Sequence, residues 1–167
     1  MREWLPGALV VCMIDVPPRY QAAEVLGYDL KLFVSLDMSS FPCSSAANAT
    51  VLRQYVANYS SHPNQLRWNG AVFISTFSGS DCTFGRNSSA EGWKAEFIDK
   101  LTGENAVHFV PSFFVDPSTF SEYDGVMNGD FNVGRMRSMG RARIHSSSIV
   151  LVEWRLAHRP HVLLRCV

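Results

Sequence analysis

Acidic and amide side chains recur where the short apolar runs of this sequence end. Asp37 closes the first run, Ser75 lies near the end of the second, and Asp116 follows the third. Asp130 and Asn132 come next, in a Gly-Asp-Phe-Asn segment. Carboxylates bind hydroxyl groups and can protonate a glycosidic oxygen, and neighbouring aromatic rings can stack on sugar rings. This combination indicates carbohydrate chemistry.

Several of these residues also have a structural interpretation. Asp37 could cap the turn after its run, and Asp116, which precedes Pro117, could simply start a turn. His62, in a Ser-His-Pro-Asn turn, suits a polar loop residue better than a catalytic base, and His108 suits a structural role at a strand start. Neither a Gly-x-Ser-x-Gly elbow nor a glycine-rich phosphate loop is present. No Ser/His/Asp triad and no cofactor are therefore expected.

The elements that must position these side chains are three similar apolar runs. Phe33, Phe73 and Phe109 occupy matching places in them, 40 and 36 residues apart. Aromatic and β-branched residues bounded by turn residues are typical of buried strands. We predict strands over 31–38, 71–77 and 107–115.

Amphipathic helices are predicted between these strands. Apolar residues recur at helical spacing over 44–59, after a candidate Ser cap, and over 89–101, with Gly103 as a stop signal. A shorter helix is predicted from Tyr20 to Leu26, closed by Gly27. Alternating helices and strands indicate an α/β fold with a parallel sheet and right-handed crossovers. A doubly wound sheet and a (β/α)8 TIM barrel both fit. The self-similar strands favour the barrel, of which this length holds the first three to four βα units, because eight units need about 250 residues.

Cysteine and asparagine positions bear on the compartment. Cys43 and Cys82 each follow the end of a predicted strand, and these strands would be neighbours, so a disulfide between them is expected in an oxidising compartment. No cysteine pair has metal-ligand spacing, so no metal site is expected. Asn48, Asn58 and Asn87 begin N-glycosylation sequons, which fit a secreted protein but also arise by chance.

Composition and charge divide the chain. Its 167 residues are 47% hydrophobic and 18% charged, which excludes disorder, and no run reaches the roughly 18 apolar residues of a membrane span. Residues 1–132 carry eight Lys and Arg against fourteen Asp and Glu, whereas residues 133–167 carry seven Arg against one Glu. The basic tail, with Arg135, Arg137, Arg141 and Arg143, could be a nucleic-acid or membrane-surface arm. Coding sequence read out of frame or through an intron is the favoured explanation of these arginines, so neither a nucleic-acid nor a membrane partner is expected. The apolar stretch 8–14 makes a poor secretory signal.

Several blocks in one order carry a family resemblance. They are Tyr28-Asp-Leu-Lys-Leu-Phe-Val-Ser-Leu-Asp-Met-Ser-Ser-Phe-Pro-Cys43, Ser61-His-Pro-Asn-Gln-Leu66, Val72-Phe-Ile-Ser-Thr-Phe-Ser-Gly79, Cys82-Thr-Phe-Gly85, Phe109-Val-Pro-Ser-Phe-Phe-Val-Asp-Pro117 and Gly129-Asp-Phe-Asn132. Over residues 19–132 the chain resembles glycoside hydrolase family 71, the fungal α-1,3-glucanases or mutanases. The resemblance implies a secreted, monomeric (β/α)8 barrel that hydrolyses α-1,3-glucan without a metal, by an inverting mechanism that uses one carboxylic acid and one carboxylate.

The resemblance also has limits. The family's first strand is not recognisable before residue 19, and its late Asn-Asp-x-x-Glu-Ser segment, where the acid pair is expected, occurs nowhere in this sequence. The catalytic pair therefore stays unassigned. The implied substrate-cleft residues are Asp37, Ser75, Asp116, Asp130 and Asn132. We expect a truncated member with three parts, residues 1–18, 19–132 and 133–167; the alternative is a fragment that binds glucan without cleaving it or has no function.

Overall fold

The computed structural model describes residues 8–12, 16–27, 31–130, 151–153 and 163–165. Its main sheet has four parallel strands in the order β1, β2, β4, β5, with the short strand β3 paired antiparallel to β4. The strands are β1 (Ala8–Cys12), β2 (Lys31–Asp37), β3 (Arg67–Trp68), β4 (Ala71–Phe77) and β5 (Val107–Ser112). The predicted parallel α/β architecture is confirmed, and the third predicted strand ends at Ser112 instead of residue 115.

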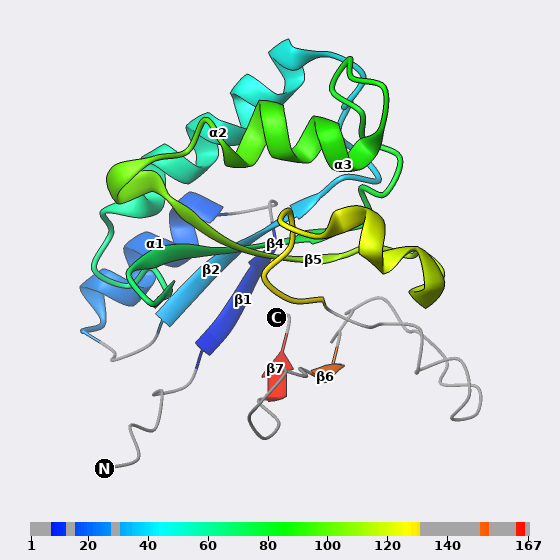
Figure 1. Ribbon diagram of the computed structural model, residues 1–167. Coiled ribbons are helices and arrows are strands. Elements are labelled where there is room, and N and C mark those ends of the chain that lie inside the picture. Colours follow the sequence, from blue (N-terminus) through cyan, green and yellow to red (C-terminus); the bar gives the residue numbers. More distant parts are fainter. Residues whose placement is uncertain (1–7, 13–15, 28–30, 131–150, 154–162, 166–167) are drawn as a thin grey trace.

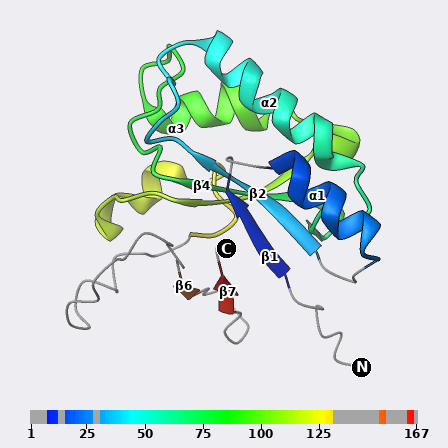
Figure 2. The ribbon, with the colours of Figure 1, turned by 180° about the vertical axis from the view of Figure 1, so that it is seen from behind.

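The helices α1, α2 and α3 lie together on one face of this sheet (Figure 1). The view from behind shows the same arrangement (Figure 2). The helical segments are α1 (Val16–Val25), α2 (Ala46–Ser60), α3 (Ser89–Gly92), which continues as the π-helix η1 (Trp93–Ile98), and two 3₁₀ turns, η2 (Gly103–Asn105) and η3 (Pro117–Tyr123). A separate antiparallel pair joins β6 (Leu151–Glu153) to β7 (Leu163–Arg165). Among the described helices, none has the length and apolar character needed to cross a membrane.

The amino-terminal part differs from the prediction. No strand was predicted before residue 19, yet β1 pairs in parallel with β2, from Ala8 opposite Lys31 to Cys12 opposite Ser35. Helix α1 begins at Val16, four residues earlier than predicted. Two prolines follow in its first turn, where a helix tolerates them because the first N–H groups have no intrahelical partner. Gly27 follows the carboxyl end of α1 with a φ of 61° and closes the helix, as predicted.

The core fills the space between the sheet and the helices. Side chains at alternate positions of β2 and β4 face the helices, and Trp93 packs among them with no exposed surface. Its ring contacts four Phe rings, and its Nε1 donates to the Gly79 carbonyl at 2.9 Å. The side chains that face the helices from these strands are Leu32, Val34, Leu36, Val72 and Ile74. The remaining positions of each strand therefore point to the opposite face of the sheet.

A short segment lies between β2 and β4 at their amino ends. The Leu32 N–H donates to the Asn64 carbonyl at 2.7 Å, and Leu66 bonds Leu32 on one side and Phe73 on the other. The chain then turns back into β4 through Asn69 and Gly70, whose φ angles of 50° and 81° are those of a tight hairpin turn. The two strands pair directly only over their carboxyl halves, from Val34 opposite Ile74 to Asp37 opposite Phe77.

Candidate functional site

Three strand ends bring a carboxylate, an aromatic ring and a hydroxyl into one row. Asp37 of β2 lies opposite Phe77 of β4, which lies opposite Ser112 of β5, so the three side chains share the face of the sheet that points away from the helices. The ladder continues past the strand ends, because the N–H of Met38 donates to the Phe77 carbonyl at 3.0 Å. Phe114, just after β5, contacts Phe77 edge to face at a ring distance of 5.2 Å. The row sits at the carboxyl ends of the strands, where parallel α/β folds hold their functional residues.

Asp37 caps its turn, as one interpretation of the sequence suggested. Its Oδ1 accepts hydrogen bonds from the Ser39 N–H at 3.0 Å and the Ser39 hydroxyl at 2.6 Å. Both bonds go to the same oxygen, and within the described chain nothing bonds Oδ2. The cap therefore fixes the orientation of the carboxylate and leaves one oxygen able to accept a hydrogen bond from a ligand.

Ser75 lies deeper in the sheet than the row. It is opposite Ser35 of β2 and Val110 of β5, and its side chain is buried. Its hydroxyl makes one long bond, to the Thr76 carbonyl at 3.4 Å. Ser35 and Ser75 thus form a pair of hydroxyls on the same face of the sheet, two residues before Asp37 and Phe77 on the respective strands.

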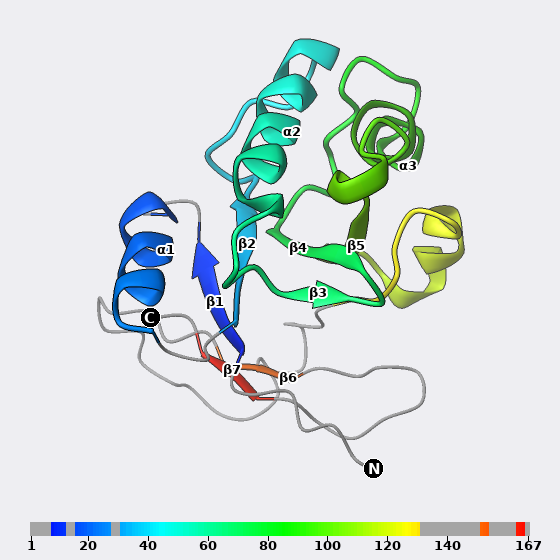
Figure 3. The ribbon, with the colours of Figure 1, turned by 90° about the vertical axis from the view of Figure 1, so that its left-hand side faces the viewer.

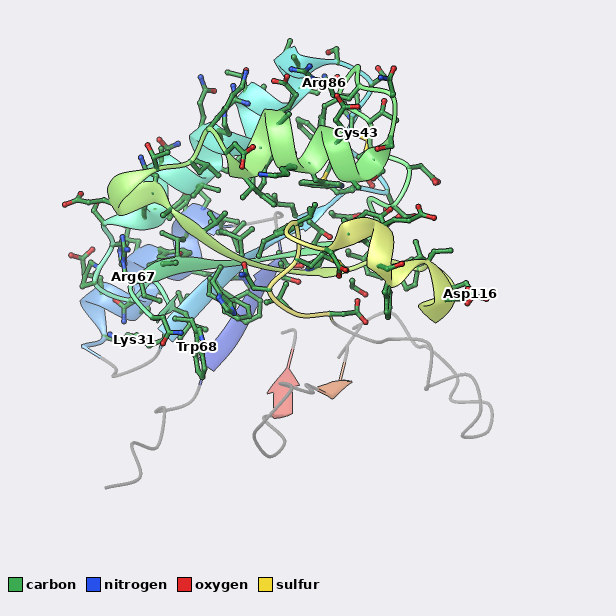
Figure 4. The ribbon with its side chains drawn as sticks, in the orientation of Figure 1. Lys31, Cys43, Arg67, Trp68, Arg86 and Asp116 are labelled. Atoms are coloured by element: carbon green, nitrogen blue, oxygen red, sulfur yellow. A yellow bond between two sulfur atoms is a disulfide. The ribbon has the colours of Figure 1, made fainter. Side chains whose placement is uncertain are left out.

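Asp116 starts the η3 segment and caps it. Its Oδ1 accepts from the Ser118 N–H at 2.9 Å and the Ser118 hydroxyl at 2.7 Å. The hydrogen bond from the Ser118 backbone, with that from its hydroxyl, lowers the pKa of the Asp116 carboxyl below its ordinary value. Figure 4 shows Asp116 at the outer end of this segment, on the opposite side of the molecule from Lys31 and Arg67. This carboxylate is exposed and ionised, which suits an acceptor and not a proton donor.

Asp130 lies beside β5. Asn128 forms two hydrogen bonds with the Phe109 backbone, at 2.7 and 2.8 Å, and Gly129 follows against Val110. Desolvation raises the pKa of the Asp130 carboxyl to about 6, and its buried Oδ1 has no hydrogen-bond partner in the described part of the chain. This carboxyl group keeps its proton at mildly acidic pH. Asn132, the next predicted residue, lies outside the described residues.

A disulfide holds the loops that follow β2 and β4. Cys43 and Cys82 are bonded at an S–S distance of 2.10 Å, which confirms the predicted pair. The Phe84 N–H donates to the Cys43 carbonyl at 2.8 Å and adds a second link between the same loops. Both loops leave the sheet at the end where the row lies, so the disulfide fixes the surroundings of Asp37 and Phe77.

One buried ionic cluster was missed by the sequence analysis. The Glu96 carboxylate of η1 is buried and is bonded by Arg86 and by Lys100, the latter at 2.9 Å. These bonds, that from Arg86 first, lower the pKa of Glu96. The spacing of Glu96 and Lys100, four residues apart on a helix, is the signal that could have revealed it. Figure 4 shows Arg86 on the side of the molecule where the helices lie. The cluster therefore stabilises the loop that leads from β4 into α3.

His62 and His108 have structural contacts, as expected from their positions in the sequence. His62 Nε2 lies 3.4 Å from a Glu24 oxygen, and the ring packs edge-on against Tyr20. His108 packs against Phe73, and burial lowers the pKa of its imidazole. Neither residue belongs to the row at the strand ends.

A hollow of about 650 Å³ lies at the amino ends of the strands. Its cationic side chains are already engaged, since Lys31 bonds the Pro63 carbonyl at 3.0 Å and Arg67 bonds the Ser60 and Glu104 carbonyls at 2.7 and 2.8 Å. Figure 3 shows β3, which contributes Arg67, below the helical layer beside β4. These bonds hold the connection between α2 and β4. The side chains that line this hollow therefore have a structural role.

Known proteins resemble the part of the chain that carries the site. A sequence model of glycosyl hydrolase family 71 matches residues 14–134. Glucan endo-1,3-alpha-glucosidase agn1 of Schizosaccharomyces pombe is 37% identical over 95 residues, which cover 56% of this chain and 22% of the relative. Ascus wall endo-1,3-alpha-glucanase of the same yeast is 32% identical over 111 residues, 66% of this chain and 25% of the relative. The chain thus spans about a quarter of the length of these relatives, and no solved structure matches it.

Proposed function

The chain belongs to glycosyl hydrolase family 71, and on this basis we propose that it serves the hydrolysis of α-1,3-glucosidic bonds in α-1,3-glucan. The names of the two yeast relatives, both endo-1,3-alpha-glucan hydrolases, support a glucanase of the endo type. The observation that carries the proposal is the row of Asp37, Phe77 and Ser112 at the carboxyl ends of neighbouring strands. It combines acceptor, ring and hydroxyl, the groups that a polysaccharide cleft needs.

The proposed cleft residues are those predicted from the sequence: Asp37, Ser75, Asp116, Asp130 and Asn132. An inverting mechanism needs a protonated acid and an ionised base about 6.5 to 9.5 Å apart, with room for a water molecule. We assign neither role, since the sequence lacks the Asn-Asp-x-x-Glu-Ser segment. Asp37 and Asp116, whose second oxygens are not used by the turns they cap, would accept hydrogen bonds from sugar hydroxyls.

The sheet is proposed as the first part of a (β/α)8 barrel. Four parallel strands with helices on one face support this, because the other face would then line the barrel interior. The Cys43–Cys82 disulfide supports secretion into an oxidising compartment. Asn58 and Asn87 are exposed, whereas Asn48 is half-buried and its side-chain oxygen accepts from Ser45 in the cap of α2. We propose a secreted monomer that carries glycans at its sequons.

The structure describes the basic tail only at β6 and β7. The arginines Arg135, Arg137, Arg141 and Arg143 lie outside the described residues.

A second candidate function is glucan binding without cleavage. The row of Asp37, Phe77 and Ser112 favours it, because an acceptor oxygen, a ring and a hydroxyl can hold a sugar chain by themselves, whereas cleavage also needs an acid pair. The two candidates predict the same ligand and differ only in product release.

Incubation of the 167-residue chain, with its disulfide intact, with insoluble α-1,3-glucan distinguishes these candidates. The measurements are the protein fraction that pellets with the glucan and the reducing sugar released. Asp37→Asn is the informative variant because an amide oxygen can still accept from Ser39, while the charge is lost. Glu104→Gln, an exposed acid at the amino end, is its matched control.

Sugar release that falls in Asp37→Asn but not in Glu104→Gln supports hydrolysis. Retention without release supports the binding function. A chain that neither pellets with α-1,3-glucan nor releases sugar contradicts both candidates.

A further inference from the structure

We infer that Phe77, Phe114 and Ser112 form a sugar-binding subsite, in which one glucose ring of α-1,3-glucan stacks on the aromatic pair and bonds the Ser112 hydroxyl. The inference rests on the proposed function and specifies where the glucan chain is held. Phe114 and Ser112 were not among the residues selected from the sequence.

The first observation is the exposure of the aromatic pair. Phe77 is 41% exposed and Phe114 53% exposed, and their rings meet at an interplanar angle of 78°. In the described part of the chain they are the aromatic residues among the exposed large apolar side chains. Phe113, the residue before Phe114, is instead buried against Trp93 and Tyr123. An exposed apolar pair at the functional end of a sheet indicates a binding surface.

The second observation is the Ser112 hydroxyl. The residue is 4% exposed, and its Oγ has no hydrogen-bond partner among the described residues. Since Ser112 lies opposite Phe77 in the β4–β5 register, this unpaired group is next to the exposed ring on the same face. A buried hydroxyl without a partner is unfavourable, and a ligand hydroxyl would satisfy it.

The third observation is the mixture of groups, which selects the ligand class. A purely apolar partner would cover the two rings and leave the Ser112 hydroxyl and Asp37 Oδ2 unpaired. A pyranose ring presents an apolar C–H face together with hydroxyls around its edge. It can therefore contact the rings with that face and bond both polar groups with its edge.

The test is a retention isotherm on insoluble α-1,3-glucan. Phe77→Leu and Phe114→Leu keep an apolar side chain but remove the flat ring. Phe114→Tyr changes the same position and keeps the ring. Leu26→Ala, which truncates an exposed residue (59%) after α1, is the matched control. We expect each Leu variant to raise the Kd about tenfold, equivalent to about 1.4 kcal/mol, and Phe114→Tyr and Leu26→Ala to leave it within about twofold, well below that tenfold step.

Ser112→Ala separates ligand binding from a structural role of the hydroxyl. If the hydroxyl serves the ligand, the variant weakens retention roughly fivefold while its urea midpoint stays the same or rises, because an unpaired buried group has been removed. If a bound water serves it instead, affinity stays unchanged and the Ser112 part of the inference is wrong.

The controls also separate this inference from the proposed function. Wild-type retention that both Leu variants preserve overturns the subsite and leaves the glucan function in place. A wild-type chain that does not bind α-1,3-glucan contradicts both.

Discussion

Breaking the bond between Cys43 and Cys82 should lower the free energy of unfolding by about 4 kcal/mol. The two cysteines are 39 residues apart in sequence. For a closed loop of that length, the chain-entropy relation gives a stabilisation of about 4 kcal/mol at 25 °C, because the crosslink restricts the unfolded chain. With a urea m value of about 1.5 kcal/mol per molar, the unfolding midpoint should fall by roughly 2.5 M.

The assay compares urea unfolding of the oxidised chain with that of Cys43→Ser/Cys82→Ala. Alanine is chosen at position 82 because Cys82 is only 2% exposed, and a serine hydroxyl there would add a desolvation cost. Cys12 and Cys166 are replaced by Ser in both proteins so that no other disulfide can form. Reduction of the oxidised protein should produce the same midpoint as the double variant. A difference below about 1 kcal/mol in the free energy of unfolding would refute the entropic reasoning, since it predicts several times more.

Three other predictions concern stability and pH. Gly92→Ala should destabilise by about 3 kcal/mol or more, because a Cβ there would lie 2.2 Å from the Thr83 carbonyl oxygen; Gly129→Ala, whose Cβ would meet Val110 at 3.4 Å, should be nearly neutral in the same urea titration. Tyr20→Phe removes a hydroxyl that donates to Gln65 at 2.5 Å and should cost about 1 to 3 kcal/mol in thermal unfolding, which an unchanged Tm would contradict. The native pKa of Asp130, about 6 against an ordinary 3.8, means that the folded state binds this proton more tightly than the unfolded state. Its contribution to stability is therefore present below about pH 4 and is lost as the pH rises through about 6, and Asp130→Asn should flatten that part of the pH profile; an unchanged profile would count against the desolvated carboxyl.

The strands and long helices could be predicted because their side-chain patterns match their burial. The alternation in 31–38 and 71–77 corresponds to one face on the helices and one face away from them. Strand β1 was missed because it is a short apolar run, which fits several structures equally well. The π-helical geometry of η1 was also beyond prediction, because the apolar spacing over 89–101 fits a regular α-helix.

Strand β3 was missed although the sequence carries a signal for it. Asn69 and Gly70 separate Trp68 from Ala71, and an Asn-Gly pair between two strand residues is typical of a two-residue hairpin. The preceding segment 64–66 has no comparable signal. Its place between β2 and β4 is fixed by backbone hydrogen bonds and by the Tyr20–Gln65 contact, which join distant parts of the chain.

The candidate site could be predicted in part. The strand-end rule located Asp37, and the spacing of strand ends suggested the disulfide. The strand-end rule could not show that Phe113 is buried and Phe114 exposed. Strand β5 ends at Ser112, and the residues after it follow no fixed alternation between the two faces. Nor could the rule show that Asp37 and Asp116 each use one oxygen for a cap, which depends on the turn geometry.

The segment 64–66 gives the two ends of β2 and β4 different tolerances for evolutionary change. At the amino end the strands are joined through residues 64–66, which bond both of them, so only the exposed Asn69–Gly70 turn can accept an inserted residue without breaking these bonds. At the carboxyl end they pair directly, and any displacement of β4 moves Phe77 relative to Asp37. Lineages that diverge from this chain should therefore vary in the number of residues at the Asn69–Gly70 turn, while the register that places Asp37 opposite Phe77 is kept.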